Sequence, residues 1–243
     1  MLQACLNGAR TRAEFPGLPV LPAELAAQAK AAVSAGAQDI HLHPKNADGV
    51  DTLEPPVVAA AIAAVRATLP TSVQVGVTTG SWAEPDPERR AAMIRSWPVL
   101  PDHASVNWHE DGAEKVAHAL LARGVGIEAG LYSGTDAVRR FRTSALNGKV
   151  LRVLAEVTDA DVQSAIVTAR SLVEDIRSVW AGRILLHGEG AGVWPVLKLA
   201  TEFGFDARIG LEDALLLPDG SAPAGNADLV RAAIKLISET EPS

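Results

Sequence analysis

Two histidines separated by one residue are the strongest sign of chemistry in this sequence. His41 and His43 stand in H-L-H-P, at the end of a run typical of a buried strand. In a strand, residues i and i+2 point to the same side, so both imidazoles can converge on one metal ion. Pro44 is expected to end the strand there. The alternative is that they are two unrelated loop histidines.

A catalytic zinc site has three protein ligands and one open position. The best third ligand is Glu212, in R-I-G-L-E-D at 208–213, where the last predicted strand ends. If the strands close into a barrel, the first strand lies between the second and the last. The histidines and Glu212 can then meet over its end. The alternative is that Glu212 and Asp213 are ordinary capping acids for the next helical segment.

Further polar residues follow the predicted strands and could contact a ligand, although each could equally serve a turn or a helix cap. They are Asn7 and Arg10 after the first strand, Thr78, Thr79, Gly80 and Ser81 after the third, Asn107 and His109 after the fourth, and Glu128 at the end of the fifth. His187 ends the seventh strand at the same face. We expect His118, within a helix, to be structural, and His103, before its strand, to lie at the opposite face.

Eight strand-like runs alternate with eight helical stretches. The expected strands are 2–6, 39–43, 72–77, 104–107, 125–129, 150–156, 183–187 and 206–211. The expected helices are 22–35, 55–69, 86–94, 113–122, 136–141 capped by Thr135, one beginning at Thr158, 193–203 and one beginning near Asn226. This alternation implies a parallel sheet with right-handed crossovers. We therefore predict an α/β fold, a single-domain (β/α)₈ TIM barrel over residues 1–243, with its active site at the carboxyl ends of the strands.

An open doubly wound sheet is the alternative architecture. It would need fewer strands or a glycine-rich dinucleotide loop, and neither GxGxxG after the first strand nor GxxxxGK[ST] is present. The segment G-E-G-A-G at 188–192 follows the seventh strand and could cradle a phosphate group at a helix start. It could equally be a flexible turn.

Composition excludes several classes of protein. The 243 residues are 48% hydrophobic and 21% charged, as in ordinary globular proteins, and the net charge of −7 argues against a general nucleic-acid binder. Cys5 is the one cysteine, so no intramolecular disulfide can form, which fits a reducing compartment. We see no signal peptide and no apolar stretch of about 20 residues, and we expect a cytoplasmic protein without a membrane partner.

Taken together, several segments resemble the β-keto acid cleavage enzyme family, whose founding activity is 3-keto-5-aminohexanoate cleavage. They are L-N-G-A-R-T at 6–11, P-A-E-L-A-A-Q-A at 22–29, A-G-A-Q-D-I-H-L-H-P-K at 35–45 with D-G at 48–49, T-T-G at 78–80, R-I-G-L-E-D at 208–213 and G-N-A-D-L-V at 225–230. They span almost the whole chain in family order. H-x-H-P combined with R-x-G-L-E-D is specific, whereas T-T-G alone is not.

The resemblance implies a (β/α)₈ barrel and a Zn²⁺ ion, or another divalent metal, held by His41, His43 and Glu212. It also assigns the family's Arg–Asp pair to Arg208 and Asp213. Members convert a β-keto acid and acetyl-CoA into acetoacetate and a new CoA thioester. They are usually homo-oligomers, so we expect a tetramer or a dimer.

The mechanism implied by the resemblance is a retro-Claisen reaction. The metal would act as a Lewis acid on the keto acid, and Asp213, oriented by Arg208, would be the general base. The residues expected to bind substrate are Asn7, Arg10, Thr78, Thr79, Ser81, Asn107 and Glu128. The chain is shorter than most members, which indicates trimmed loops. Arg10 stands where members with an amino-bearing substrate have an acidic residue, so a cationic substrate is not expected.

Two rival functions remain at this point. A zinc hydrolase of the amidohydrolase type is also a barrel with H-x-H, but it places that motif after the first strand and needs histidines after strands five and six. The second rival is a metal- or ligand-binding barrel without catalytic activity, against which the presence of both Arg208 and Asp213 speaks.

Overall fold

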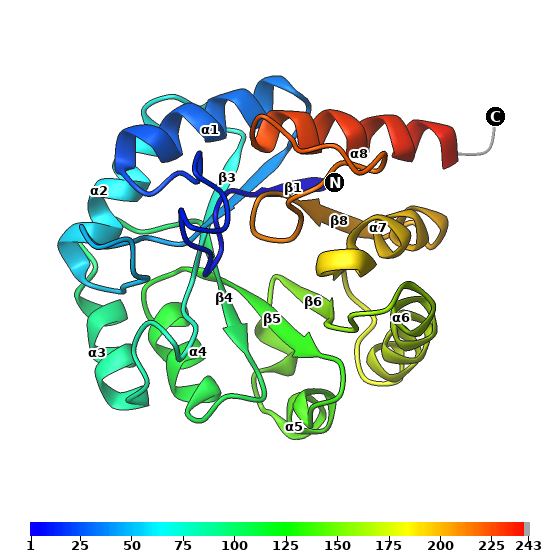
Figure 1. Ribbon diagram of the computed structural model, residues 1–243. Coiled ribbons are helices and arrows are strands. Elements are labelled where there is room, and N and C mark those ends of the chain that lie inside the picture. Colours follow the sequence, from blue (N-terminus) through cyan, green and yellow to red (C-terminus); the bar gives the residue numbers. More distant parts are fainter. Residues whose placement is uncertain (241–243) are drawn as a thin grey trace.

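The computed structural model describes residues 1–240, which form one closed barrel of parallel strands surrounded by helices (Figure 1). The strands are β1 (Leu2–Cys5), β2 (Asp39–Leu42), β3 (Gln74–Thr78), β4 (His103–Asn107), β5 (Gly126–Tyr132), β6 (Arg152–Val157), β7 (Ile184–Gly188) and β8 (Asp206–Ile209). Each pairs with its neighbours in sequence, and β1 closes the barrel by pairing with both β2 and β8. The predicted (β/α)₈ fold is confirmed.

A ring of helices covers the outside of the barrel. They are α1 (Pro22–Ser34), α2 (Pro55–Arg66), α3 (Pro87–Ser96), α4 (Ala113–Leu121), α5 (Ala137–Thr143), α6 (Val162–Arg177), α7 (Val193–Glu202) and α8 (Asn226–Thr240), with short 3₁₀ turns η1 (Asn147–Lys149) and η2 (Gly190–Gly192). Proline opens the first three α-helices, where its missing N–H costs no hydrogen bond. Among residues 1–240 no helix is long and apolar enough to cross a membrane.

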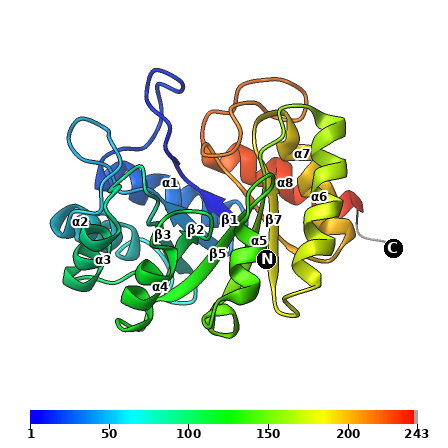
Figure 2. The same cartoon turned by 90° about the horizontal axis from the view of Figure 1, so that it is seen from below.

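The loops after β1 and β8 lie over the same end of the barrel. In Figure 1 the segments that follow these two strands, dark blue and orange, cover the centre of the ring. Figure 2 shows both projecting from one end of the molecule. This is the carboxyl end of the parallel strands, the face on which barrel enzymes build their active sites.

Several predicted bounds are shifted by a few residues: β2 ends at Leu42, so His43 lies just beyond the strand, and β8 ends at Ile209 rather than at residue 211. Three further shifts also matter. β5 continues to Tyr132, so Glu128 lies inside the strand and not at its end. α6 begins at Val162 and not at Thr158, because the Asp161 carboxylate accepts the free N–H groups of the first turn at 2.9 and 3.0 Å. His103 is the first residue of β4 rather than a residue before it. The N-cap of α5 is Asp136 rather than the predicted Thr135, although the Thr135 hydroxyl accepts from Ala137 N–H at 3.2 Å.

A charged network fills the inside of the barrel. Arg152 donates to Glu128 at 2.6 Å and to Asp39 at 2.8 Å, and His103 lies 3.0 Å from Asp39 and 3.2 Å from Glu128. All four side chains are buried. Burial disfavours a charged imidazole, but the Glu128 and Asp39 carboxylates outweigh it and raise the pKa of His103 to about 10. Two cations therefore balance two carboxylates in the interior.

Replacing Arg152 by methionine should destabilise the barrel. The substitution keeps the side-chain length but leaves two buried carboxylates with one cation, and breaking a buried pair in this way costs about 3 to 5 kcal/mol. The free energy of unfolding, measured with urea, is the test. Lys235→Met removes the exposed Lys235–Glu239 pair and should leave that free energy unchanged. An Arg152 variant as stable as the wild type would contradict the balance of charges described here.

Candidate metal centre

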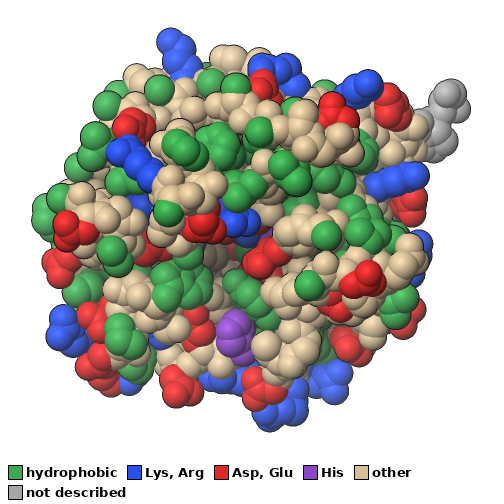
Figure 3. Space-filling view, in the orientation of Figure 1, with side chains coloured by type: hydrophobic (Ala, Val, Ile, Leu, Met, Phe, Trp, Pro, Cys, Tyr) green, Lys and Arg blue, Asp and Glu red, His purple; other side chains and the backbone are tan. Residues whose placement is uncertain are grey.

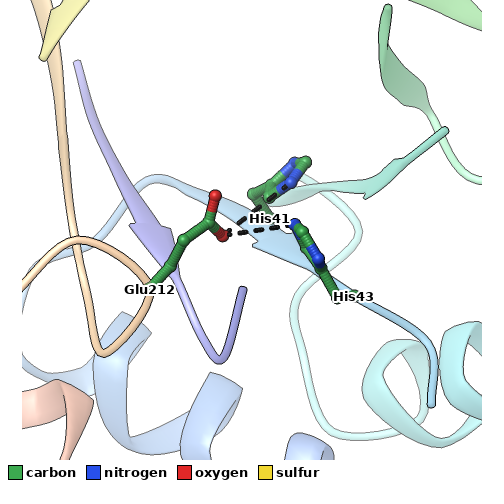
Figure 4. A group of neighbouring side chains, drawn as sticks. All are labelled: His41, His43 and Glu212. Carbon is green, nitrogen blue, oxygen red and sulfur yellow. Dashed lines mark ion pairs between the residues drawn. The ribbon is translucent and has the colours of Figure 1, made fainter. Parts of the chain in front are cut away.

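Three predicted ligands converge at the carboxyl end of the barrel (Figure 4). Oε2 of Glu212 lies 3.6 Å from Nε2 of His43 and 4.0 Å from Nε2 of His41. The ligand atoms lie within 4.8 Å of one another. In a tetrahedral zinc site with bonds of about 2.0 to 2.2 Å, ligand atoms stand about 3.3 to 3.6 Å apart. A small contraction of this cluster therefore suffices to hold one divalent ion.

The strand order brings the three ligands together. His41 pairs with Cys5 of β1, and β8 lies on the other side of β1. Two glycines allow the close approach: a Cβ at residue 210 would lie 1.9 Å from the carbonyl oxygen of Cys5, and one at Gly8 would lie 2.5 Å from the Glu212 side chain. Any larger residue at either position would displace Glu212.

The donor set fits a divalent cation. Oε1 of Glu212 accepts from Arg208 at 2.8 Å, whereas its Oε2, which faces both histidines, has no hydrogen-bond partner among the described residues. Burial lowers the pKa of His41 to about 4, so this imidazole is neutral and offers a lone pair. Although burial opposes it, the carboxylates of Glu212 and Asp51 raise the pKa of His43 to about 9. A bound cation would take the place of that proton.

Asp51 contacts Nδ1 of His43, the ring nitrogen that does not face Glu212. Its Oδ2 lies 2.7 Å from Nδ1 of His43 and accepts from the Trp82 indole at 2.9 Å, while Oδ1 contacts Lys45. Because Nδ1 faces this carboxylate, Nε2 is the nitrogen left to bind a metal. The Trp82 ring also stacks on His43, with 5.9 Å between the centroids. No motif or spacing singles out Asp51, which lies in the loop after the histidines.

Replacing Asp51 by asparagine should weaken metal binding. The amide keeps the shape of the side chain but removes the negative charge that fixes and polarises His43. Changes of this kind lower metal affinity by about 10- to 100-fold. Competition with a coloured chelator measures the affinity. Asp48→Asn, an exposed substitution in the same loop, is the control and should bind metal as the wild type does. Equal affinities in the two variants would rule out this role of Asp51.

Arg208 and Asp213 form a buried pair beside the ligands. Nε and Nη2 of Arg208 donate to Oδ1 of Asp213 at 3.2 and 2.7 Å. Burial raises the pKa of Asp213 to about 6 even though Arg208 opposes the shift, so the carboxylate is mostly ionised at neutral pH. Its Oδ2 has no hydrogen-bond partner among the described residues. An ionised carboxylate with one free oxygen is suited to accept a proton.

A cavity of about 350 Å³ opens onto two of the three candidate ligands, His43 and Glu212. It is lined by Ala9, Arg10, Glu14, His43, Trp82, Tyr132, Glu189 and Glu212. Figure 3 shows a hollow at the centre of this face, in which acidic and basic side chains lie. Arg10 is the predicted substrate residue that lines the cavity. It donates to the Glu212 carbonyl at 2.9 Å and pairs with Glu14 at 3.0 Å.

The two predicted asparagines bind neighbouring protein groups. The Asn7 amide joins the loops after β1 and β2, because it donates to the carbonyls of Pro19 and His43 and accepts from His43 N–H. Asn107 donates to the Glu110 carboxylate at 2.8 Å. Asn7 thus helps to fix His43, a candidate metal ligand, and direct substrate contact by either asparagine stays a prediction.

Most of the remaining predicted substrate residues make hydrogen bonds to neighbouring loop or strand groups. The Thr79 hydroxyl donates to the Ser105 carbonyl, that of Thr78 accepts from Gly80 N–H, and the backbone N–H of Ser81 donates to Glu110. Glu128 lies deeper, where its Oε2 is 3.8 Å from Nδ1 of His41. At this position Glu128 faces Nδ1 of His41, the ring nitrogen that is not directed toward Glu212. Substrate contact by these four residues is likewise untested.

Tyr132 and Glu189 line the cavity but were not selected from the sequence. Tyr132 lies at the end of β5, which was predicted three residues too short, so the correct strand end would have identified it. Glu189 directly follows β7 within G-E-G-A-G, a segment considered only for its glycines. The rule that strand ends carry functional residues would have found both.

Fold and site together define a (β/α)₈-barrel protein with a candidate metal centre and a buried Arg–Asp pair at the carboxyl ends of its strands. A comparison with protein families specifies this class further. The model of the beta-keto acid cleavage enzyme family matches residues 1–242, so the chain belongs to that family and is an enzyme. The family match decides between this interpretation and the two rivals, the amidohydrolase and the non-catalytic barrel.

Relatives agree with the family, and solved structures share the fold. The 3-keto-5-aminohexanoate cleavage enzymes of Fusobacterium nucleatum and Acetoanaerobium sticklandii are 26% and 24% identical over 98% of this chain, which covers 91% and 92% of those proteins. ObcA in a ternary complex with a C4-CoA adduct and oxalate superimposes with a TM-score of 0.76 at 15% identity over 92% of this chain. This chain spans 64% of that ObcA chain and 63% of ObcA in complex with oxaloacetate. At such identity the superposition shows a shared fold.

Proposed function

We propose that this enzyme is metal-dependent and condenses a β-keto acid with acetyl-CoA, giving acetoacetate and a new acyl-CoA by a retro-Claisen route. The observation that carries the proposal is the convergence of His41, His43 and Glu212 beside the buried Arg208–Asp213 pair. The ObcA complexes with oxaloacetate and with a C4-CoA adduct support substrates of these two kinds.

The two histidines and Glu212 would hold the metal. Two imidazoles and one carboxylate with an open position are the ligand set of a catalytic zinc, and the same set accepts cobalt, nickel or manganese. When bound, the cation supplies Lewis-acid polarisation of the keto and carboxylate oxygens of the substrate. Arg208 contributes by donating to Oε1 of Glu212, which leaves Oε2 directed toward the two histidines.

Asp213 would move the proton. Its free Oδ2 takes a proton from the carbon between the keto and carboxylate groups, and Arg208 keeps the carboxylate ionised and oriented. The carbanion attacks the thioester carbonyl of acetyl-CoA and expels the CoA thiolate. That thiolate attacks the original keto carbon and breaks its bond to the central carbon, which releases acyl-CoA. Protonation of the remaining carbanion by Asp213 gives acetoacetate.

The substrate side chain would lie in the cavity above the ligands. We propose a neutral or acidic side chain rather than a cationic one, because Arg10, which pairs with Glu14 in this cavity, stands where members with an amino-bearing substrate have an acidic residue. Thr78, Thr79, Ser81 and Asn107 follow β3 and β4 and are proposed to contact the substrate or the thioester oxygen. We further propose that the enzyme acts in the cytoplasm as a homo-oligomer, a tetramer or a dimer.

One assay tests the proposed function. The zinc-loaded protein is incubated with acetyl-CoA and β-keto acids whose side chains are alkyl, acidic or amino-bearing, and acetoacetate and acyl-CoA are measured by mass spectrometry. We expect both products in equal amounts with at least one neutral or acidic substrate. Absence of both products with zinc, cobalt and manganese would overturn the proposal. Hydrolysis of amide substrates in parallel reactions would instead support a hydrolase.

A further inference from the structure

His187 lies between two buried carboxylates next to the candidate metal centre. It belongs to β7, and its side chain is 1% exposed. Its Nδ1 is 3.6 Å from Oδ1 of Asp213, and its Nε2 is 3.3 Å from Oε2 of Glu156. Glu156 is directly opposite it on β6, where the two residues are partners in the strand register. Neither residue has a part in the mechanism described so far.

We propose that His187, held by Glu156, is a positioning residue for Asp213. It donates from Nδ1 to Oδ1 of Asp213, so that Oδ2 is the oxygen turned toward the substrate. The inference rests on the proposed function, in which Asp213 is the general base.

The distribution of contacts on Asp213 favours this arrangement. Oδ1 receives both hydrogen bonds from Arg208 and faces His187, whereas Oδ2 has no hydrogen-bond partner among the described residues. Arg208 belongs to β8 and His187 to β7, so Oδ1 is contacted by side chains from two different strands. Two such contacts fix the rotation of a carboxylate that Arg208 alone would leave freer to turn.

The surroundings of His187 also select one tautomer. Burial, aided by the positive charge of Arg208, lowers the pKa of His187 to about 4, so the imidazole is neutral. A neutral imidazole donates from one nitrogen and accepts at the other. Burial raises the pKa of Glu156 to about 7, so its carboxyl group can carry a proton and donate it to Nε2. The ring proton then lies on Nδ1, facing Asp213.

Both contacts of His187 are longer than ordinary hydrogen bonds, and neither ring nitrogen has a bonded partner among the described residues. Catalytic hydrogen bonds are often long before substrate binds and shorten in the complex. If His187 only filled space, an apolar group of similar volume could replace it without loss of activity. If it positions Asp213 by donating a hydrogen bond, the same replacement would lower activity.

Two variants of similar shape separate these roles. In His187→Asn the amide NH₂ can donate from close to the position of Nδ1, whereas His187→Leu offers no donor. We expect the leucine variant to lose about tenfold or more in kcat with KM and metal content unchanged, because small errors in the position of a reacting group are costly. The asparagine variant should recover most of that loss. A leucine variant as active as the asparagine variant, or a change confined to KM, would overturn the proposal.

A second measurement needs no substrate. Nitrogen-15 NMR of the metal-loaded wild-type protein reports which nitrogen of His187 carries the proton, and His187→Asn identifies the signal by its absence. We expect a neutral ring protonated at Nδ1, with its resonance shifted in Asp213→Asn. A ring protonated at Nε2, or a charged ring, would overturn the proposal even in a protein without cleavage activity. An inactive wild type would contradict the proposed function alone.

Discussion

Replacing His41 by alanine should give a folded barrel that neither retains a divalent ion nor cleaves a β-keto acid. The substitution removes one of three ligands, and the remaining His43 and Glu212 cannot enclose the ion. Lewis-acid catalysis contributes several kcal/mol to stabilisation of the transition state, so turnover should fall at least about a thousandfold. The imidazole borders the Arg152 network at Glu128, 3.8 Å away, but Nδ1 makes no hydrogen bond to the described residues, so the fold should persist.

Metal content after dialysis, measured by mass spectrometry, and circular dichroism test this expectation beside the activity assay. His118→Ala is the matched control, since it removes an exposed histidine on α4 and should leave metal content and turnover unchanged. A folded His41→Ala protein that keeps one equivalent of metal and full activity would contradict both the metal site and the mechanism.

The fold and the convergence of His41, His43 and Glu212 were predictable because they depend largely on short-range regularities. Alternation of β-branched and alanine-rich runs predicted the barrel, and the two-residue period of a strand placed His41 and His43 on one side. The third ligand needed one more step, which is that β1 separates β2 from β8 in a closed barrel. That topology alone brings Glu212 close to residues about 170 positions earlier in the chain.

The residues that sequence analysis misplaced or overlooked depend on register and loop shape. Glu128 was placed at a strand end because the predicted strand stopped at residue 129, but β5 continues through Gly130, which approaches Asn107 and Glu156 closely, to Tyr132. Asp51 reaches His43 only through the path of the loop between them. Glu156 and His187 are neighbours because of the β6–β7 register, which no spacing in the sequence reveals.

The same limit applies to the polar residues after β3 and β4. Their types suit substrate binding, and in the structure Ser81 and Asn107 both bind the Glu110 carboxylate, which also pairs with Arg90. One acidic residue therefore organises two loops at the mouth of the barrel. Residue types alone cannot show whether a side chain contacts the substrate or instead holds in place a loop that contacts it.

Replacing Asp213 by asparagine should preserve the metal and abolish turnover. The amide has the shape of the carboxylate, and its oxygen can still accept from Arg208, so the ligands His41, His43 and Glu212 should stay in place. It cannot accept a proton from carbon. Loss of a general base lowers rates by about 10²- to 10⁴-fold, so we expect kcat to fall at least about a hundredfold. The metal content should equal that of the wild type.

Comparison with His41→Ala separates the two roles. His41→Ala should lose metal and activity together, whereas Asp213→Asn should lose activity alone. Asp219→Asn, in the exposed part of the same β8–α8 segment, is the matched control and should match the wild type in both measurements. An Asp213→Asn enzyme that keeps its metal and its full kcat would transfer the role of base to another residue. Glu156, buried and with a raised pKa, would then be the first carboxyl group to replace.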